Sequence, residues 1–383
     1  MNNKTENSPR RPMVGQLGKM LLAAAMTMPA MQVARADSAP EKAMVGYKFL
    51  DYQDWQGGQS RIAVHAPAFA FQLPFAETWS VEGTVVNDTV SGASPRYHTS
   101  RFVGMQDKRA GKNLSISRYF GRGSLTFGVA YSSETDYRSR AYSLSGNISS
   151  EDKNTTLNLG IGVSNDEIYP SSGIMMGEHL RKNGNEMMIG VTQVLTQTDI
   201  VQANVTYGKG RGYFSDPYKF LDERPERKNQ LATLLRWNHH FRETDGTTHL
   251  SYRWYKDDYG IRSHTISGEY VQPFGNGWSV TPLLRIYSQN AADFYSDALK
   301  DPTVWPVPAD WTPGVPLSFD QRLAAYGARS FGFKLSKRID HDWLFDFKYE
   351  NYEQRSSWAF GHGSPNLEPL KARILQIGMS YYF

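Results

Sequence analysis

Apolar and polar residues alternate in short segments along most of the chain. Leu, Phe, Val and Tyr stand at positions 125, 127, 129 and 131, with Thr, Gly and Ala between them. Segments 157–163 and 343–349 repeat this period of two. Successive side chains of a strand point to opposite faces, so each segment predicts a β-strand with one apolar and one small or polar face.

Sixteen such strands are predicted. They cover 43–53, 60–73, 78–90, 109–120, 123–135, 138–149, 153–166, 184–195, 198–209, 226–242, 247–258, 261–274, 277–289, 321–337, 342–355 and 371–383. Fourteen or eighteen strands would follow from merging or splitting ambiguous segments. The first two are the weakest, the second because Pro67 cannot donate to a strand ladder.

Short and long connections alternate between these strands. Short turns fall at 73–77, 120–123, 195–198, 274–277 and 338–341, and longer polar connections at 91–108, 167–183, 210–225, 290–320 and 356–370. Aromatic residues stand beside the short turns: Phe75, Trp79, Phe120, Phe274, Trp278, Trp343 and Phe383. Short periplasmic turns, long external loops and an aromatic girdle are typical of bacterial outer-membrane barrels. The pattern predicts an all-β fold, a single antiparallel up-and-down transmembrane barrel.

The segment 371–383 has Leu, Ile, Met, Tyr and Phe at alternate positions from 375 to 383. A barrel leaves no free edge, so this strand is expected to pair with 43–53. Alternating apolar residues before a terminal Phe383 resemble the assembly signal of outer-membrane proteins. We expect the barrel assembly machinery and periplasmic chaperones to act on this chain.

The first residues resemble a secretory signal peptide. Basic residues at 10, 11 and 19 precede an apolar stretch at 20–31 that is too short to span a bilayer as a helix. Ala34-Arg35-Ala36 has the small-x-small pattern of a cleavage site. We expect residues 1–36 to be removed, with Met13 as an alternative start, and 37–383 to form the barrel in the cell outer membrane of a Gram-negative bacterium.

Composition excludes several classes of protein. The chain has no cysteine, so disulfides and thiolate sites are unavailable. A net charge of +4 in 383 residues gives no indication of nucleic-acid binding. Beyond the signal peptide no segment approaches about 18 consecutive apolar residues, which argues against a helical membrane protein. The aromatic fraction of 13% and the 33 glycines fit a barrel with a wet lumen. A soluble sandwich or propeller is the alternative.

Several longer motifs carry a resemblance to a known family. They are Phe49-Leu50-Asp51-Tyr52-Gln53-Asp54, 90–98, 210–219, Leu235-Arg236-Trp237-Asn238-His239-His240 and 291–295. In these the chain resembles a bacterial family catalogued only as a domain of unknown function. The resemblance covers nearly all of 37–383 and implies an outer-membrane barrel. It implies no activity and no catalytic residue.

A barrel of this size has room for water, and its polar face would line the lumen. The candidate lumen charges are Lys48, Glu82, Arg236, Arg253, Glu269, Arg285, Arg322, Lys334, Asp346, Lys348 and Glu350. Basic residues of the strands within 226–289 would face acidic residues elsewhere in the barrel. The electric field between them would run across the lumen and would orient and sort ions and polar solutes. Lateral pairing of these charges, which would make the lumen rigid or shut, is the alternative.

The long connection 290–320 could fold inward as a constriction or remain a surface flap. Arg211, Arg224, Arg227 and Lys228 stand near Asp216, Asp222 and Glu223, and we expect loop-stabilising ion pairs or contacts with lipopolysaccharide phosphates. Asp293, Asp297 and Asp301 lack the spacing and glycine of a strong calcium loop, so we expect them to be structural.

No catalytic or metal-binding signature is evident. His98, His239, His240, His249 and His264 have no nucleophile motif beside them. His239 and His240 would point to opposite faces of a strand, which disfavours joint chelation. We therefore predict no enzyme activity, no metal and no cofactor.

Three functions remain open. We favour a porin-like channel for small polar or ionic solutes. The second is an occluded structural or docking barrel that holds a periplasmic or lipoprotein partner. The third is a barrel-borne enzyme. In each case outer-membrane lipid and lipopolysaccharide are the expected surroundings, and no nucleic acid is involved.

Overall fold

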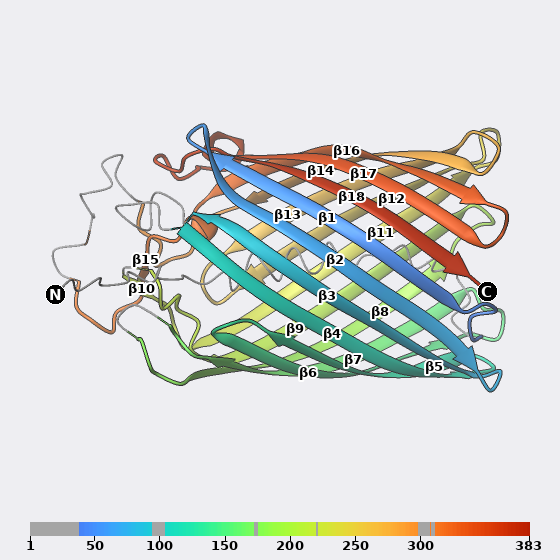
Figure 1. Cartoon of the computed structure of the whole chain (residues 1–383), viewed down its shortest axis with the longest axis horizontal. Helices are drawn as coiled ribbons and strands as arrows, with labels where there is room; N and C mark the ends of the chain where they lie inside the picture. The colour runs from blue at the N-terminus through green and yellow to red at the C-terminus, as the bar shows by residue number, and fades with distance from the viewer. Residues whose placement is uncertain (1–37, 94–103, 172–174, 220, 298–306, 308–310) are drawn as a thin grey trace, which may run out of the picture.

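The computed structural model describes residues 38–93, 104–171, 175–219, 221–297, 307 and 311–383. The predicted signal peptide and His98 lie outside these residues. Sixteen of the eighteen described strands close into one antiparallel barrel (Figure 1). These are β1 Met44–Gln56, β2 Gln59–Phe75, β3 Trp79–Ala93, β4 Gly104–Phe120, β5 Gly123–Ser133, β6 Tyr137–Ser149, β7 Thr155–Ile168, β8 Leu180–Val194, β9 Asp199–Gly212, β11 Arg227–Phe241, β12 Gly246–Asp257, β13 Arg262–Pro273, β14 Trp278–Gln289, β16 Tyr326–Ile339, β17 Trp343–Arg355 and β18 Leu370–Tyr382.

Each barrel strand pairs with the next barrel strand along the chain, and β1 pairs with β18 to close the ring. Phe49 lies opposite Ile377 in this closing pair. The ladder extends beyond the strands, because Ala43 and Phe383 exchange backbone hydrogen bonds of 2.8 and 2.9 Å. The predicted fold and strand count are confirmed. Closure leaves no strand edge in the barrel, as a lipid-embedded sheet requires.

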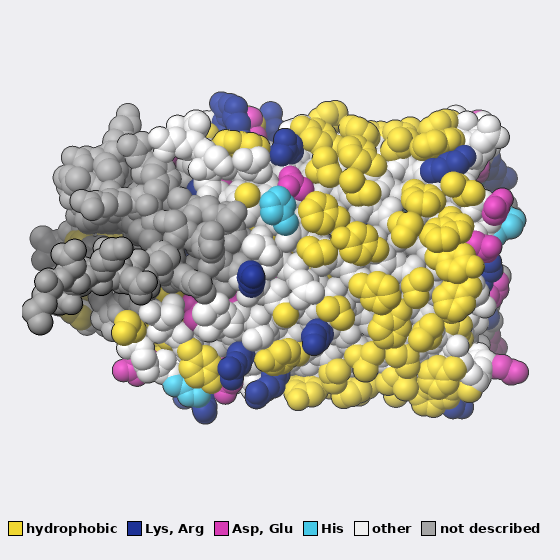
Figure 2. Space-filling model, in the orientation of Figure 1, with side chains coloured by type: hydrophobic (Ala, Val, Ile, Leu, Met, Phe, Trp, Pro, Cys, Tyr) yellow, Lys and Arg dark blue, Asp and Glu magenta, His cyan; other side chains and the backbone are white. Residues whose placement is uncertain are grey.

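One face of the strands carries large apolar side chains that remain exposed. Leu125 and Phe127 of β5 and Ile161 of β7 are about half exposed, and the register places their neighbours on the same outer face. Figure 2 shows apolar side chains covering the barrel wall over most of its length. An exposed apolar surface of this extent is suited to lipid rather than water.

Aromatic side chains gather at the end where the short turns lie. Phe75 stacks on Trp79 and Phe274 on Trp278, and Trp343, Tyr381 and Phe383 form a third group. Arg118 lies over the Trp79 ring at 4.9 Å. This arrangement matches the predicted girdle, since aromatic and long basic side chains favour the interface between hydrocarbon and water.

Most strand bounds differ from the predicted ones by a few residues, and two places in the strands are informative. Pro67 lies inside β2 without ending it: the β2–β3 pairing skips Ala66 and Pro67 and resumes in the same register at Ala68. The missing proline N–H therefore costs only a local gap in the ladder. The strand predicted at 321–337 begins only at Tyr326, because residues Gln321–Leu323 form a 3₁₀ turn, η1.

Two short strands at the other end were not predicted. β10, Asp222–Glu223, and β15, Leu317–Ser318, pair with each other outside the barrel (Figure 1). They join the connection after β9 to the connection after β14. We call this the long-loop end, although the β1–β2 and β5–β6 connections there are short. A second 3₁₀ turn, η2 Ser356–Trp358, follows β17. Within the described residues, no helix is long and apolar enough to cross a bilayer.

Replacing Ile377 with Arg tests the outer face as a lipid surface. Ile377 is 53% exposed and lies between Phe49 and Phe347 in the ladder. Arginine at the bilayer midplane costs about 2–4 kcal/mol in barrels of this kind. We expect less folded protein in the outer-membrane fraction, measured by heat-modifiable mobility on gels.

The neighbouring change Gln376→Glu is the matched control. Gln376 faces inward opposite Lys348, so an added carboxylate there meets a base rather than lipid. Equal loss of folded protein in both variants would contradict the assignment of the two faces.

Candidate functional site

The inward face of the barrel is the face that alternates with the exposed apolar side chains. The register connects inward residues of neighbouring strands into rows that run around the wall. In the ring of sixteen strands, β6 lies eight places from β16, so β4–β9 and β14–β18 face each other across the lumen. The two sides differ in chemistry.

The side formed by β4–β9 is lined by glycine and serine. One inward row runs Ser115, Gly128, Ser143, Gly162, Glu186 and Gly208 across six consecutive strands. We call this the glycine–serine wall. A cavity of about 790 Å³ lies against it, and every member of the row lines that cavity. Apart from Glu186 these side chains are small, and they leave room for the cavity on this side.

The opposite side carries most of the predicted lumen charges. Ten of the eleven candidates lie on inward positions of barrel strands; Glu82 on β3 and Arg236 on β11 stand on the strands that flank the glycine–serine wall. Six bases, which we call the basic wall, come from β11 to β1: Lys48, Arg236, Arg253, Arg285, Lys334 and Lys348. The acids on these strands are Glu269, Asp346 and Glu350.

Only some of these charges pair. Lys48 lies 3.9 Å from Asp346, and Lys348 lies 2.9 Å from Glu350. Lateral pairing was the alternative weighed from the sequence, and it accounts for these two bases.

Of the other four bases, Lys334 and the three arginines are without a carboxylate partner among the described residues. Arg236 donates to Gln202 at 3.3 Å, Arg285 donates to Ser267 at 3.2 Å, and Arg253 lies 5.2 Å from the Tyr255 ring centroid. All three side chains are exposed although they point inward. They present uncompensated positive charge to the lumen.

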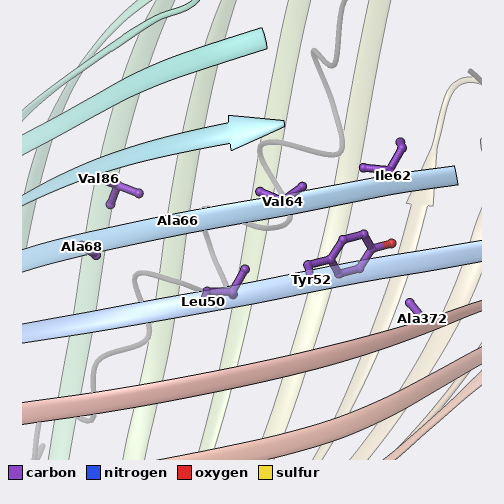
Figure 3. Packing of buried hydrophobic residues seen from close by; sticks show 8 residues of the cluster. All are labelled: Leu50, Tyr52, Ile62, Val64, Ala66, Ala68, Val86 and Ala372. Carbon is purple, nitrogen blue, oxygen red and sulfur yellow. The ribbon is translucent and has the colours of Figure 1, made fainter. Parts of the chain in front are cut away.

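An apolar strip on the inner wall was missed by the sequence analysis. Its members are Leu50, Tyr52, Ile62, Val64, Ala66, Ala68, Val86 and Ala372, from β1, β2, β3 and β18 (Figure 3). All are buried, Leu50 and Val64 completely. The signal was present in segment 62–71, where both alternate sets of positions are apolar apart from His65.

Inward tyrosines adjoin this strip. Tyr352 of β17 packs against it, and Tyr287 of β14 contacts Tyr326 of β16 with ring centroids 5.7 Å apart. Their hydroxyls are held by polar residues two positions further along: Tyr287 by Gln289 at 2.5 Å and Tyr352 by Gln354 at 3.0 Å. Residues at i and i+2 of a strand share a face, which makes this pairing local.

Buried ion pairs cluster where the barrel meets the long-loop end. Asp54 binds Arg61, Arg109 donates to Asp88 at 3.0 Å, and Lys228 lies 3.0 Å from Asp257. Asp166 binds Tyr137 at 2.5 Å and lies 3.7 Å from Lys182. Sequence reasoning missed these pairs because each joins residues from two strand ends that only the register brings together.

The placement of Arg322 in the lumen was wrong. Arg322 lies in η1 at the long-loop end, where it binds Asp320 and lies 3.3 Å from Asp216. Asp320 caps η1 by accepting from the Arg322 backbone N–H. The side chain of Leu323 packs in an apolar cluster with Tyr259, Ile261 and Ala292. The alternation of polar and apolar residues at 321–323 therefore comes from loop packing and not from a strand.

Six charges form one network at this end, which we call the loop ion cluster: Asp216, Lys219, Asp222, Arg224, Asp320 and Arg322. Arg224 and Lys219 each lie 2.6 Å from Asp320, and Arg224 lies 2.9 Å from Asp222. The expected ion pairing of Arg224 is confirmed. The cluster joins the connection after β9 to the connection after β14, alongside the β10–β15 pair.

Burial alone would raise the pKa of Asp320, but the adjacent Arg322, Lys219 and Arg224 hold it well below its usual range. The same carboxyl therefore remains ionised down to unusually low pH. The pKa of Asp320 is lower in the folded protein than in the unfolded chain, so its ionisation stabilises the fold at every pH above the pKa of the unfolded chain. This stabilisation is lost as pH falls toward the pKa of the folded state.

The described histidines each contact a different partner. His239 points outward and contacts Asp199 at 2.7 Å, while His240 lies on the inward face beside Thr247, 3.2 Å away. His249 contacts Asn238 and His264 contacts Tyr252. Asp293 lies beside Gly260, and Asp297 accepts from Tyr295 and Asn366, whereas Asp301 is outside the described residues. Among the described residues no group of three or more His, Cys, Asp or Glu could hold a metal ion.

Comparison of the sequence with family models decides the relationship. The model described as "Protein of unknown function (DUF3570)" matches residues 98–370, well over half of the chain. The chain belongs to the DUF3570 family. No curated protein matches the sequence.

Solved structures show what this DUF3570 member is similar to in fold. CdiB from Acinetobacter baumannii superposes with a TM-score of 0.51 at 9% identity, and the match covers 88% of this chain. The chain spans 60% of the CdiB chain. This likeness, together with the closed barrel, shows the fold of an outer-membrane barrel protein and supports an outer-membrane location.

Two further structures resemble it more loosely. A bacterial polysaccharide outer membrane secretin gives a TM-score of 0.48 at 8% identity, covering 89% of this chain and 98% of that one. OccK2 (OpdF) from Pseudomonas aeruginosa gives 0.44 at 11%, with coverage of 89% and 98%. Similarity this low carries no information on activity.

The loop ion cluster predicts how the long-loop end responds to Asp320→Asn. The change leaves Lys219, Arg224 and Arg322 with fewer partners, and breaking a buried ion pair costs about 3–5 kcal/mol. We expect trypsin to cleave after Lys219 and Arg322 at least roughly ten-fold faster, with the barrel intact.

The wild-type loops should remain resistant to an acid-stable protease below the usual carboxyl range, because the Asp320 pKa lies far lower. Glu178→Gln, an exposed carboxylate at the same end, is the control and should leave cleavage unchanged. Protection of Asp320→Asn equal to wild type would show that the cluster does not hold the loops.

Proposed function

We propose that this DUF3570 barrel is a porin-like channel for small polar or ionic solutes, with a preference for anions. The observation that carries the proposal is the contrast between its two sides. Arg236, Arg253 and Arg285 are exposed inward without carboxylate partners among the described residues, and the glycine–serine wall lies across the lumen from Arg285.

Such an arrangement produces a field across the lumen. Unpaired guanidinium groups raise the local concentration of anions, because charges in a pore with low-dielectric walls focus the field. The small side chains opposite leave water-filled space in which a solute can pass. Glu82 and Glu186, inward on β3 and β8, make the facing side weakly acidic.

The proposal includes the setting of the barrel. Residues 1–36 are a signal peptide cleaved after Ala36, and the chain reaches the outer membrane of a Gram-negative cell by way of periplasmic chaperones and the barrel assembly machinery. Lipopolysaccharide contacts the long-loop end. The exposed apolar belt and the aromatic girdle support this setting.

An occluded barrel that holds a partner is the second candidate. It is favoured by the apolar strip, because inward residues as apolar as Leu50 and Val64 are typical of a wall that packs against protein. The two candidates differ in whether purified protein conducts ions.

Reversal potentials in a planar bilayer under a KCl gradient test the channel. For the wild-type protein we expect a reversal potential whose sign shows that chloride permeates more readily than potassium. Replacing Arg236, Arg253 and Arg285 together with Gln should abolish that preference. The control variant carries the same replacement at Arg122 and Arg242, which are exposed in short turns, and should retain the preference for chloride. Absence of any current would favour the occluded barrel, and unchanged selectivity in the triple variant would refute the role of the arginines.

Gly162→Trp tests the path along the glycine–serine wall. A Cβ at Gly162 would meet only the Tyr142 carbonyl oxygen, at 3.8 Å, so the backbone accepts a side chain that then projects into the cavity. We expect single-channel conductance to fall by roughly half. Ile161→Trp places the same side chain on the lipid face of β7 and should conduct like wild type.

A further inference from the structure

Two strands of the basic wall repeat the same pair of residues. Arg253 and Tyr255 lie two positions apart on β12, and Arg285 and Tyr287 lie two positions apart on β14. Members of each pair point inward with their Cα atoms about 7 Å apart. Arg253 and Arg285 therefore each have a tyrosine as the next inward residue on the same strand.

The register extends this surface toward the apolar strip. Arg285 lies opposite Ser330 of β16, Ser330 opposite Tyr352 of β17, and Tyr352 opposite Ala372 of β18. Neighbouring strands lie about 4.8 Å apart, so Arg285 and Tyr352 are separated by roughly 10 Å at their Cα atoms. Ile374 stands next to Ala372 on the inward face of β18, and like Tyr352 it is only partly buried.

The tyrosine rings present carbon rather than hydroxyl to a solute. The hydroxyls of Tyr255, Tyr287 and Tyr352 donate to Asp257, Gln289 and Gln354 at 2.8, 2.5 and 3.0 Å. These bonds also fix the ring positions. What remains for recognition is flat aromatic surface on one side and unpaired guanidinium on the other.

We propose that this surface binds small organic monoanions that carry a carboxylate on an aromatic or branched apolar body. The inference rests on the proposed channel function and names the solute class. Arg285 and Arg253 bind the carboxylate, because a guanidinium matches a carboxylate in both charge and geometry. The apolar body lies on Tyr287, Tyr352 and Ile374.

The neighbouring acids limit the charge of the solute. Glu350 and Glu269 lie on the inward row next to that of Arg285, opposite Gly332 and Leu283 respectively. The Glu350 carboxylate is paired with Lys348, so a second negative charge on the solute would meet chiefly that of Glu269, and monoanions are favoured over dianions. An organic cation would meet the unpaired arginines and is excluded by the same electrostatic argument.

The test uses full-length protein with benzoate, acetate and benzylammonium as probes. We measure binding to the detergent-solubilised barrel by calorimetry and block of chloride current in a bilayer. Benzoate should bind and block at concentrations at least roughly ten-fold lower than acetate, and benzylammonium should do neither.

Two variants separate the parts of the site. Arg253→Gln with Arg285→Gln should weaken benzoate binding at least roughly ten-fold. Tyr352→Ser should weaken it by a similar factor while chloride-over-potassium selectivity stays at the wild-type value. Arg329→Gln and Tyr349→Ser alter the outer face of the same region and should bind benzoate like wild type.

Binding and conductance keep the two proposals distinguishable. A conducting barrel that treats benzoate and acetate alike overturns the site and leaves the channel standing. A barrel that binds benzoate and passes no current overturns the channel and retains the site. Equal benzoate affinity in wild type and in both lumen variants also overturns the site.

Discussion

The pairing of β1 with β18 is the interaction on which the rest of the structure depends. Hydrocarbon offers no partner to a backbone N–H or C=O, so a sheet that spans it must close. Thirteen residue pairs from Met44↔Tyr382 to Gln56↔Leu370 form this seam. Once the ring is closed, the period of two sends every second side chain to lipid and every other one to the lumen. The inner wall is therefore a consequence of closure and register.

Closure also creates the asymmetry of the lumen. Rows of inward residues are assembled from many strands, and on one side they accumulate glycine and serine from β4 to β9. Across from them, Arg285 of β14 lies near Tyr287, Tyr352 and the apolar strip, while Arg253 on β12 and Arg236 on β11 stand on the strands between β14 and β9. Within the described residues, bases with nearby carboxylates are neutralised locally. The three arginines and Lys334, which have none, give this wall its chemical character.

The long-loop end follows a different principle from the barrel. Here backbone pairing consists of the short β10–β15 pair, the Tyr295–Ser318 bridge and scattered hydrogen bonds, and the connections are also held by buried charges and by aromatic packing around Tyr259, Phe214 and Phe294. Asp320 is almost fully buried and serves Lys219, Arg224 and Arg322 together. A buried carboxylate with three cationic neighbours holds two loops that are about a hundred residues apart in sequence.

Alternation in the sequence by itself determined the strand number, the up-and-down order, the lipid face and the aromatic girdle, because each depends on a local period or on the length of a connection. It also placed Lys48, Arg236, Arg253 and Arg285 on the inward face. It could not determine which charges pair, since Lys48–Asp346 and Lys228–Asp257 join different strands through the register. Arg322 was misplaced because a capped turn and a strand end share the same alternation over three residues. The apolar strip and the arginine–tyrosine surface emerged only from the tertiary structure, because rows around a barrel are built from residues that closure, not sequence, makes neighbours.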